Sequence, residues 1–138
     1  KMDLSGKAFL NVDFSGKDLN GADFENCKFY HCTFDNASLV NCNLQNALFS
    51  NCSLYNVTAE EAELQNARFF SCNLAKAFFT HSNFKEAVLK TCQTTSSSFM
   101  NCCIENIALE ETDLPNDKMF DSELDWIKND IPDFEPNM

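Results

Sequence analysis

Apolar residues recur at every fifth position of the chain from Leu4 to Leu124, and Ala59 and Thr94 are the weakest members of the series. This period does not fit an α-helix, which has about 3.6 residues per turn. It does not fit a flat strand either, because an odd period sends alternate members to opposite faces. The clearest members are Leu4, Phe9, Phe14, Leu19, Phe24, Phe29, Phe34, Leu39, Leu44, Phe49, Leu54, Leu64, Phe69, Leu74, Phe79, Phe84 and Leu89. The chain must therefore change direction between one member and the next.

A small residue stands two positions before most of these apolar residues, as Ala22 does before Phe24 and Cys27 before Phe29. On a short extended stretch, residues two apart point to the same side, and the residue between them points away. The next two residues are mostly polar and frequently end in Asn or Gly, which tolerate the backbone conformations of tight turns. A turn every five residues winds the chain into a solenoid with an apolar interior.

The five-residue units at 22–26, 37–41, 42–46 and 62–66 resemble the A(D/N)LXX unit of the pentapeptide repeat family. The resemblance covers roughly residues 1–124. It implies an all-β fold, a right-handed quadrilateral parallel β-helix of about six coils with four units, or twenty residues, in each coil. The cysteines at 32, 52, 72 and 92 are spaced by twenty residues, which supports this coil length.

We expect one solenoid domain at residues 1–115. In its first coil Lys7 and Lys17 take inward positions that small residues take elsewhere. Lysine can lie there because its amine reaches solvent through the open end of the solenoid. We also expect the inward pattern to fade from Thr112 onward.

Residues 116–129 are predicted to form a helix that caps the last coil, and residues 130–138 an irregular tail. A cap is needed because the end of a solenoid exposes strand edges and apolar interior. The segment follows Pro115 and carries apolar residues at helical spacing. Two roles stay open for it: a cap alone, or a cap that also forms a homodimer contact, as the C-terminal segment does in some family members. The candidate residues for either role are Met119, Phe120, Leu124, Trp126 and Ile127.

The formal net charge of −11 is concentrated near the C-terminus, because residues 105–138 hold eleven acidic and two basic residues. An acidic chain disfavours direct binding to nucleic acid or to an anionic membrane. The sequence contains no apolar stretch long enough to span a bilayer.

Seven of the eight cysteines take inward positions, and only Cys103 points outward. We interpret the seven as reduced core residues, because a row of thiols along one wall cannot surround a metal ion tetrahedrally. Reduced cysteines favour a cytoplasmic location. His31 and His81 both stand at turns, with no partner at a spacing typical of a catalytic triad. We therefore predict no metal, no cofactor and no enzymatic activity.

If four units form a coil, one wall is apolar and basic on its outside. An apolar set on one flat wall indicates a contact surface, and aromatic residues and arginine dominate binding hot spots. The alternative is that these side chains merely stabilise neighbouring strands by packing on one another. The candidate contact residues are Leu10, Tyr30, Leu48, Arg68, Phe70 and Val88.

These features favour a non-catalytic scaffold that binds a protein, whose identity the sequence does not indicate. The family resemblance implies an alternative, because some members mimic DNA and bind DNA gyrase to give quinolone tolerance. A rod of about six coils at about 4.8 Å each is shorter than one turn of DNA, and its charge is unevenly distributed, so we rank this second. A secreted bacterial effector, or an interaction module of a larger protein, is a further alternative.

Overall fold

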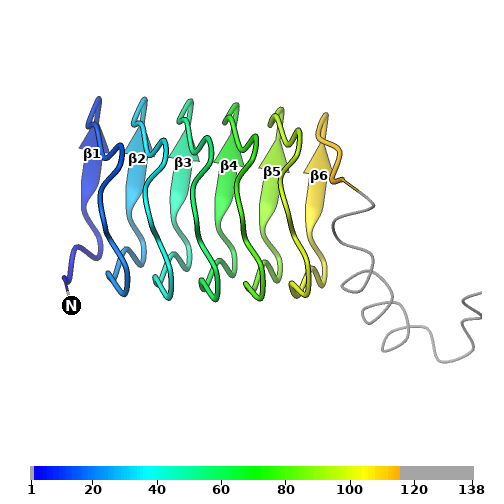
Figure 1. Cartoon of the computed structure of the whole chain (residues 1–138), viewed down its shortest axis with the longest axis horizontal. Helices are drawn as coiled ribbons and strands as arrows, with labels where there is room; N and C mark the ends of the chain where they lie inside the picture. The colour runs from blue at the N-terminus through cyan, green and yellow to red at the C-terminus, as the bar shows by residue number, and fades with distance from the viewer. Residues whose placement is uncertain (1, 116–138) are drawn as a thin grey trace, which may run out of the picture.

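The computed structural model describes residues 2–115, which wind into a parallel β-solenoid without a helix in that range (Figure 1). Each strand pairs with the next at an offset of twenty residues, so that Phe9 lies opposite Phe29 and Phe29 opposite Phe49. The strands, side by side in chain order, are β1 (Ala8–Leu10), β2 (Lys28–Tyr30), β3 (Leu48–Ser50), β4 (Arg68–Phe70), β5 (Val88–Lys90) and β6 (Ala108–Glu110). We call the wall formed by β1–β6 the strand wall.

The other three walls repeat at the same offset. Single parallel bridges join Asp13 to Thr33, Asp18 to Ser38 and Asp3 to Asp23. Four walls of five residues therefore make one coil, which confirms the all-β quadrilateral solenoid predicted from the sequence. The predicted capping helix at 116–129 and the tail at 130–138 lie outside the described residues.

The core is filled by the two inward residues of each five-residue unit. Ala22 and Phe24, for example, are both fully buried. Because successive coils are in register, equivalent rings stack along the solenoid: the Phe29 and Phe49 centroids are 4.8 Å apart, and those of Phe49 and Phe69 are 4.6 Å apart. Such ring contacts stabilise the core in addition to the stabilisation that comes from burying apolar surface area.

The first coil is the least buried part of the described chain. Lys7 and Lys17 are exposed, as expected of lysines at an open end. At the other end, only residues 112–115 of the segment in which the inward pattern is expected to fade are described; Leu114 is buried and Thr112 is half-buried, so this expectation stays a prediction. The side chain of Thr112 also bonds to the preceding coil, because its Oγ1 accepts from the Cys92 N–H at 3.0 Å.

The chain turns at a residue with positive φ in every five-residue unit. Gly6, Gly16 and Gly21 take this position in the first coil, and nineteen non-glycine residues take it elsewhere in the described chain, at φ between 47° and 63°. Ten of the nineteen are asparagine, which adopts the left-handed conformation more easily than most residues do. The positive φ at each turn therefore explains why glycine and asparagine are so frequent at this position of the repeat.

Three of the four corners in a coil are closed by a hydrogen bond from a backbone N–H to the carbonyl three residues earlier, except at Ala59–Ala62. One example is the bond from Cys27 N to Phe24 O at 3.0 Å. The corner that follows the strand wall has no such backbone bond in the described coils. We call it the open corner. Thiols of the next coil donate to carbonyls beside it: the Cys52 Sγ donates to Phe29 O, and the Cys72 Sγ to Phe49 O, both at 3.3 Å.

Candidate protein-binding wall

The structure places all six candidate contact residues on the outside of the strand wall, in two neighbouring columns. Leu48, Arg68 and Val88 are consecutive in the column formed by the first residue of each strand. The other three candidates lie in the column formed by the third residue, where Leu10 pairs with Tyr30 but Ser50 separates Tyr30 from Phe70. The apolar surface therefore zigzags between the columns.

The candidate side chains are accessible to different degrees. Leu10 is 65% exposed, which is unusual for a leucine and reflects its place on the edge strand β1. Arg68 is exposed, and Tyr30, Leu48, Phe70 and Val88 are half-buried. Half-buried apolar side chains on a rigid sheet lose little conformational freedom when a partner covers them, which favours binding.

The strand wall is basic although the chain as a whole is acidic. Its outward positions carry Lys28, Arg68, Lys90 and Glu110. Lys90 pairs with Glu110 at 3.7 Å, but the two side chains are 51% and 60% exposed, so this pair contributes little to stability. Lys28 and Arg68 form no ion pair within residues 2–115. Both are therefore available to an acidic partner.

The wall that precedes the strand wall along the chain is acidic. Asp3, Asp23 and Glu63 share one column with Asn43 and Asn83, and Cys103 ends this column in the described coils. Several of these side chains also stabilise their own turn: the Asp23 Oδ1 accepts from the Glu25 N–H at 3.0 Å. An acidic and a basic wall therefore meet along one edge of the solenoid.

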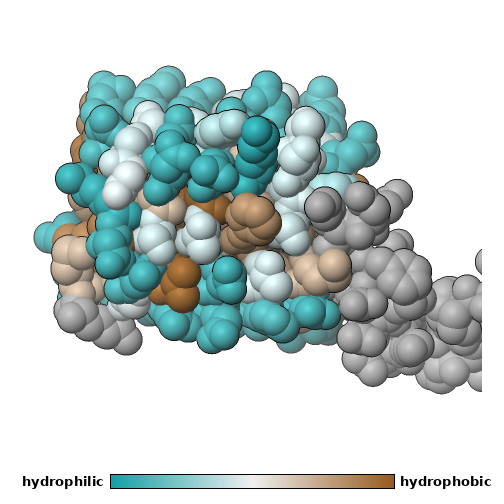
Figure 2. Space-filling model, in the orientation of Figure 1, coloured by the Kyte–Doolittle hydropathy of each residue, from teal (hydrophilic) through white to brown (hydrophobic). Residues whose placement is uncertain are grey.

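Exposed apolar side chains on the other walls are scattered. Phe78 is 46% exposed and lies two walls from the strand wall, between Thr58 and Ser98 in its column. On the face turned to the viewer in Figure 2, hydrophobic residues are isolated among hydrophilic ones. Phe78 is thus a natural control for experiments on the strand wall.

The described residues offer little for catalysis or metal binding. His31 and His81 are exposed turn residues, and residues 2–115 contain no group of three potential metal ligands. Seven of the eight cysteines are buried and Cys103 is exposed, as predicted. Burial raises the pKa of Cys42 to about 11 and that of Cys102 to about 12, so these thiols stay protonated at neutral pH.

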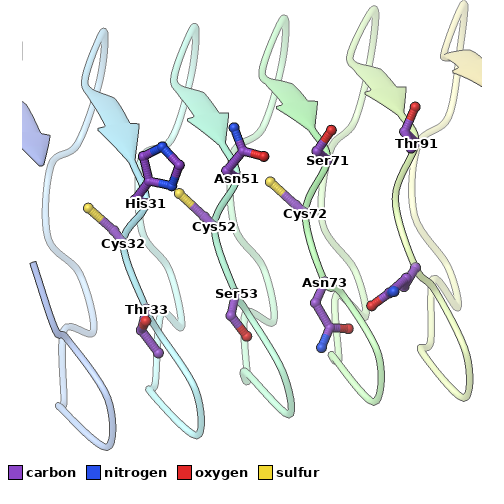
Figure 3. Close-up of a pocket in the computed structure, with 11 residues that line it drawn as sticks. His31, Cys32, Thr33, Asn51, Cys52, Ser53, Ser71, Cys72, Asn73 and Thr91 are labelled. Atoms are coloured by element: carbon purple, nitrogen blue, oxygen red, sulfur yellow. The ribbon is translucent and has the colours of Figure 1, made fainter. Parts of the chain in front are cut away.

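A polar groove runs along the open corner and was not predicted from the sequence (Figure 3). Its lining residues look like ordinary polar turn residues when they are read along the chain. Sampling every twentieth residue would have shown that they form two uncharged columns, but nothing in the sequence indicates that this corner is hollow.

The predicted cap and dimer residues Met119, Phe120, Leu124, Trp126 and Ile127 lie outside the described residues, so both roles remain predictions. Within the described part of the chain, no helix has the length and apolar character that crossing a bilayer requires.

Two family models match the sequence. The model described as pentapeptide repeats matches in eight copies, at residues 8–46 and 32–69. The model described as the SV2A/B/C luminal domain matches residues 51–128, which is more than half of the chain. A comparison with curated proteins finds no significant match.

Several solved structures are similar to this chain at low sequence identity. A pentapeptide repeat protein (Rfr23) from the cyanobacterium Cyanothece 51142 is 20% identical, with a TM-score of 0.49, over 82% of this chain and 87% of that one. A pentapeptide repeat protein from the Arabidopsis thaliana thylakoid lumen is 22% identical, with a TM-score of 0.38, over 91% and 77%. The trypsin-treated plasmid-mediated fluoroquinolone resistance protein QnrB1 is 21% identical, with a TM-score of 0.29, over 92% and 86%.

Proposed function

The chain is a pentapeptide repeat protein that belongs to the SV2A/B/C luminal domain family, and from this premise we propose that it is a non-catalytic scaffold whose strand wall binds another protein. The observation that carries the proposal is the composition of that wall. It combines aromatic and aliphatic side chains with unpaired cations on a protein of net charge −11.

The chemistry of the wall defines the partner it would accept. Lys28 and Arg68 lie two coils apart, which is about 9.6 Å along a sheet with strands about 4.8 Å apart. Apolar side chains such as Leu48 lie between them. We therefore expect a partner surface that places carboxylates around an apolar centre, a combination that favours both steering and burial.

Affinity capture with a double variant tests this proposal. We expect the Tyr30→Ser/Phe70→Ser protein to recover at least tenfold less partner than the wild type, because both ring surfaces leave the wall. Phe78→Ser is the matched control, since it removes an exposed phenylalanine from a different wall. Equal recovery by the double variant and the control would contradict the role of the strand wall.

Gyrase binding remains the second candidate. The acidic wall with Asp3, Asp23 and Glu63 supports it, since a mimic of DNA must present negative charge. The basic strand wall beside it counts against it, because DNA is negative on all sides. In a gyrase supercoiling assay we expect no inhibition and no protection from a fluoroquinolone by this chain; a clear effect of either kind would reverse the ranking.

The compartment is a separate part of the proposal. The sequence favours the cytoplasm because its cysteines are reduced. Seven of the thiols are buried, however, and burial shields a thiol from oxidation in any compartment. The description of the family names a luminal domain, which supports a lumen as the alternative. Protease protection of the tagged protein in sealed vesicles from its source cells separates the two: degradation without detergent would argue for the cytoplasmic side.

A further inference from the structure

A groove of about 530 Å³ runs along the open corner and crosses four successive coils (Figure 3). One side consists of the turn residues that follow the strand wall, namely His31, Asn51, Ser71 and Thr91. The other side consists of the outward residues of the next wall, namely Thr33, Ser53, Asn73 and Gln93. Between the two columns lie the buried residues Cys32, Cys52 and Cys72.

The lining of the groove is polar and, with histidine neutral, carries no charge. This is unexpected in a chain with 22% charged residues. The side chains of His31, Thr33, Ser71 and Thr91 also form no hydrogen bond to any other described residue. The groove thus presents hydroxyl, amide and imidazole groups that can hydrogen-bond to a ligand.

The spacing of these groups is set by the solenoid. Equivalent side chains in neighbouring coils are about 4.8 Å apart, so the four coils extend over about 14 Å. An extended peptide repeats its side-chain direction only every two residues, about 6.6 Å, and falls out of register with this array. One sugar ring of an extended, β-linked glycan advances its chain by a length close to that of one coil.

We propose that the groove binds an extended, uncharged oligosaccharide, with about one sugar ring for each coil. Sugar hydroxyls both donate and accept hydrogen bonds, as do the hydroxyl and amide side chains of the two columns. A nucleic acid or an acidic glycan would meet no cation in the lining. This inference is independent of the protein-binding role of the strand wall.

NMR of the two histidines tests the proposal with an internal control. His31 lines the groove, whereas His81 is an exposed turn residue at a different corner. We expect cellohexaose or chitohexaose, added at millimolar concentration, to shift the ring signals of His31 and to leave those of His81 unchanged. Oligogalacturonate, which is acidic, should shift neither.

Two matched variants locate the binding. Ser71→Arg fills the middle of the groove, and Asn66→Arg places the same side chain at an exposed positive-φ turn one corner earlier in the same coil. We expect at least tenfold weaker sugar binding with Ser71→Arg and less than a twofold change with Asn66→Arg, with the circular dichroism of both like the wild type.

Several results would overturn the inference. The inference fails if neither neutral sugar shifts the ring signals of His31, or if the ring signals of both histidines shift equally. It also fails if a folded Ser71→Arg protein binds the sugar as tightly as the wild type. An equally strong effect of an uncharged extended peptide such as Ser-Gly-Ser-Gly-Ser-Gly would assign the groove to peptides instead. If Ser71→Arg fails to fold, the histidine shifts of the wild-type protein alone decide the question.

Discussion

At the scale of single residues, the buried thiols act as hydrogen-bond donors between neighbouring coils. The Cys92 Sγ donates to Phe69 O at 3.3 Å, as the equivalent cysteines do one and two coils earlier. One hydroxyl makes a comparable bond between coils at another corner. The Ser82 Oγ accepts from the Ala62 N–H at 3.0 Å and donates to Ala59 O at 2.7 Å, where it replaces the direct backbone bond of that corner.

This comparison predicts different costs for two substitutions of Cys72. Cys72→Ala removes the thiol hydrogen bond to Phe49 O and leaves a small cavity in the core, and we expect a loss of about 1–3 kcal/mol in the free energy of unfolding. Cys72→Ser keeps a donor, and we expect a change within about 1 kcal/mol. Urea unfolding followed by circular dichroism measures both, with the exposed Cys103→Ala as control. A serine variant as unstable as the alanine variant would show that packing, and not the hydrogen bond, selects cysteine.

The buried thiols also predict a pH dependence of stability. Burial raises the pKa of Cys42 from 9.0 to about 11, so above pH 9 the unfolded chain loses this proton first. The contribution of Cys42 to stability is therefore complete below pH 9 and is lost as the pH rises toward 11. We expect the urea midpoint to fall between pH 8 and 10.5, and to fall less in Cys42→Ser, whose hydroxyl does not titrate. Identical falls in the two proteins would assign the effect to other groups.

At the scale of the single coil, backbone strain at the turns limits stability. Thr91 has φ of 55°, a conformation that β-branched residues rarely adopt. Asn51 takes the equivalent position two coils earlier at the same φ without that penalty. The coil therefore tolerates a poor turn residue because its neighbours in the solenoid determine the path of the backbone.

Thr91→Asn should relieve this strain. We expect an increase of about 1 kcal/mol in the free energy of unfolding, from the usual cost of the left-handed conformation. Thr95→Asn is the control, because Thr95 is also exposed but does not have a positive φ. Urea unfolding should separate the two variants; an equal gain in both would mean that asparagine helps by a route other than its φ preference.

The coil was predictable from the sequence, whereas the geometry of its corners was not. Phe29, Phe49 and Phe69 reveal the stacking in sequence because the repeat is regular and each member is apolar. The positions of Tyr30 and Arg68 on one wall follow from the same twenty-residue coil length. The loss of one backbone hydrogen bond in four leaves no trace in the repeat, so neither the open corner nor the groove beside it could be predicted.

At the scale of the whole molecule, the described solenoid separates its surfaces by chemistry. The strand wall is basic and apolar, the wall before it is acidic, and the open corner after it is polar and uncharged. Because successive coils are joined by backbone hydrogen bonds on every wall, these surfaces keep fixed spacings. Such an arrangement suits a scaffold that presents several contact surfaces at once, which is the role we propose.

All of these surfaces depend on the four-walled, twenty-residue coil, and a pair of deletions tests it most directly. Deletion of residues 51–70 joins Ser50 to Ser71 and removes one coil, so that every later residue keeps its wall. Deletion of residues 51–55 removes one wall and shifts every later residue to the wrong one. We predict a cooperative thermal unfolding transition and a β-type circular dichroism spectrum for the twenty-residue deletion, and the loss of both for the shorter deletion. A five-residue deletion that unfolds as cooperatively as the twenty-residue deletion would contradict the account.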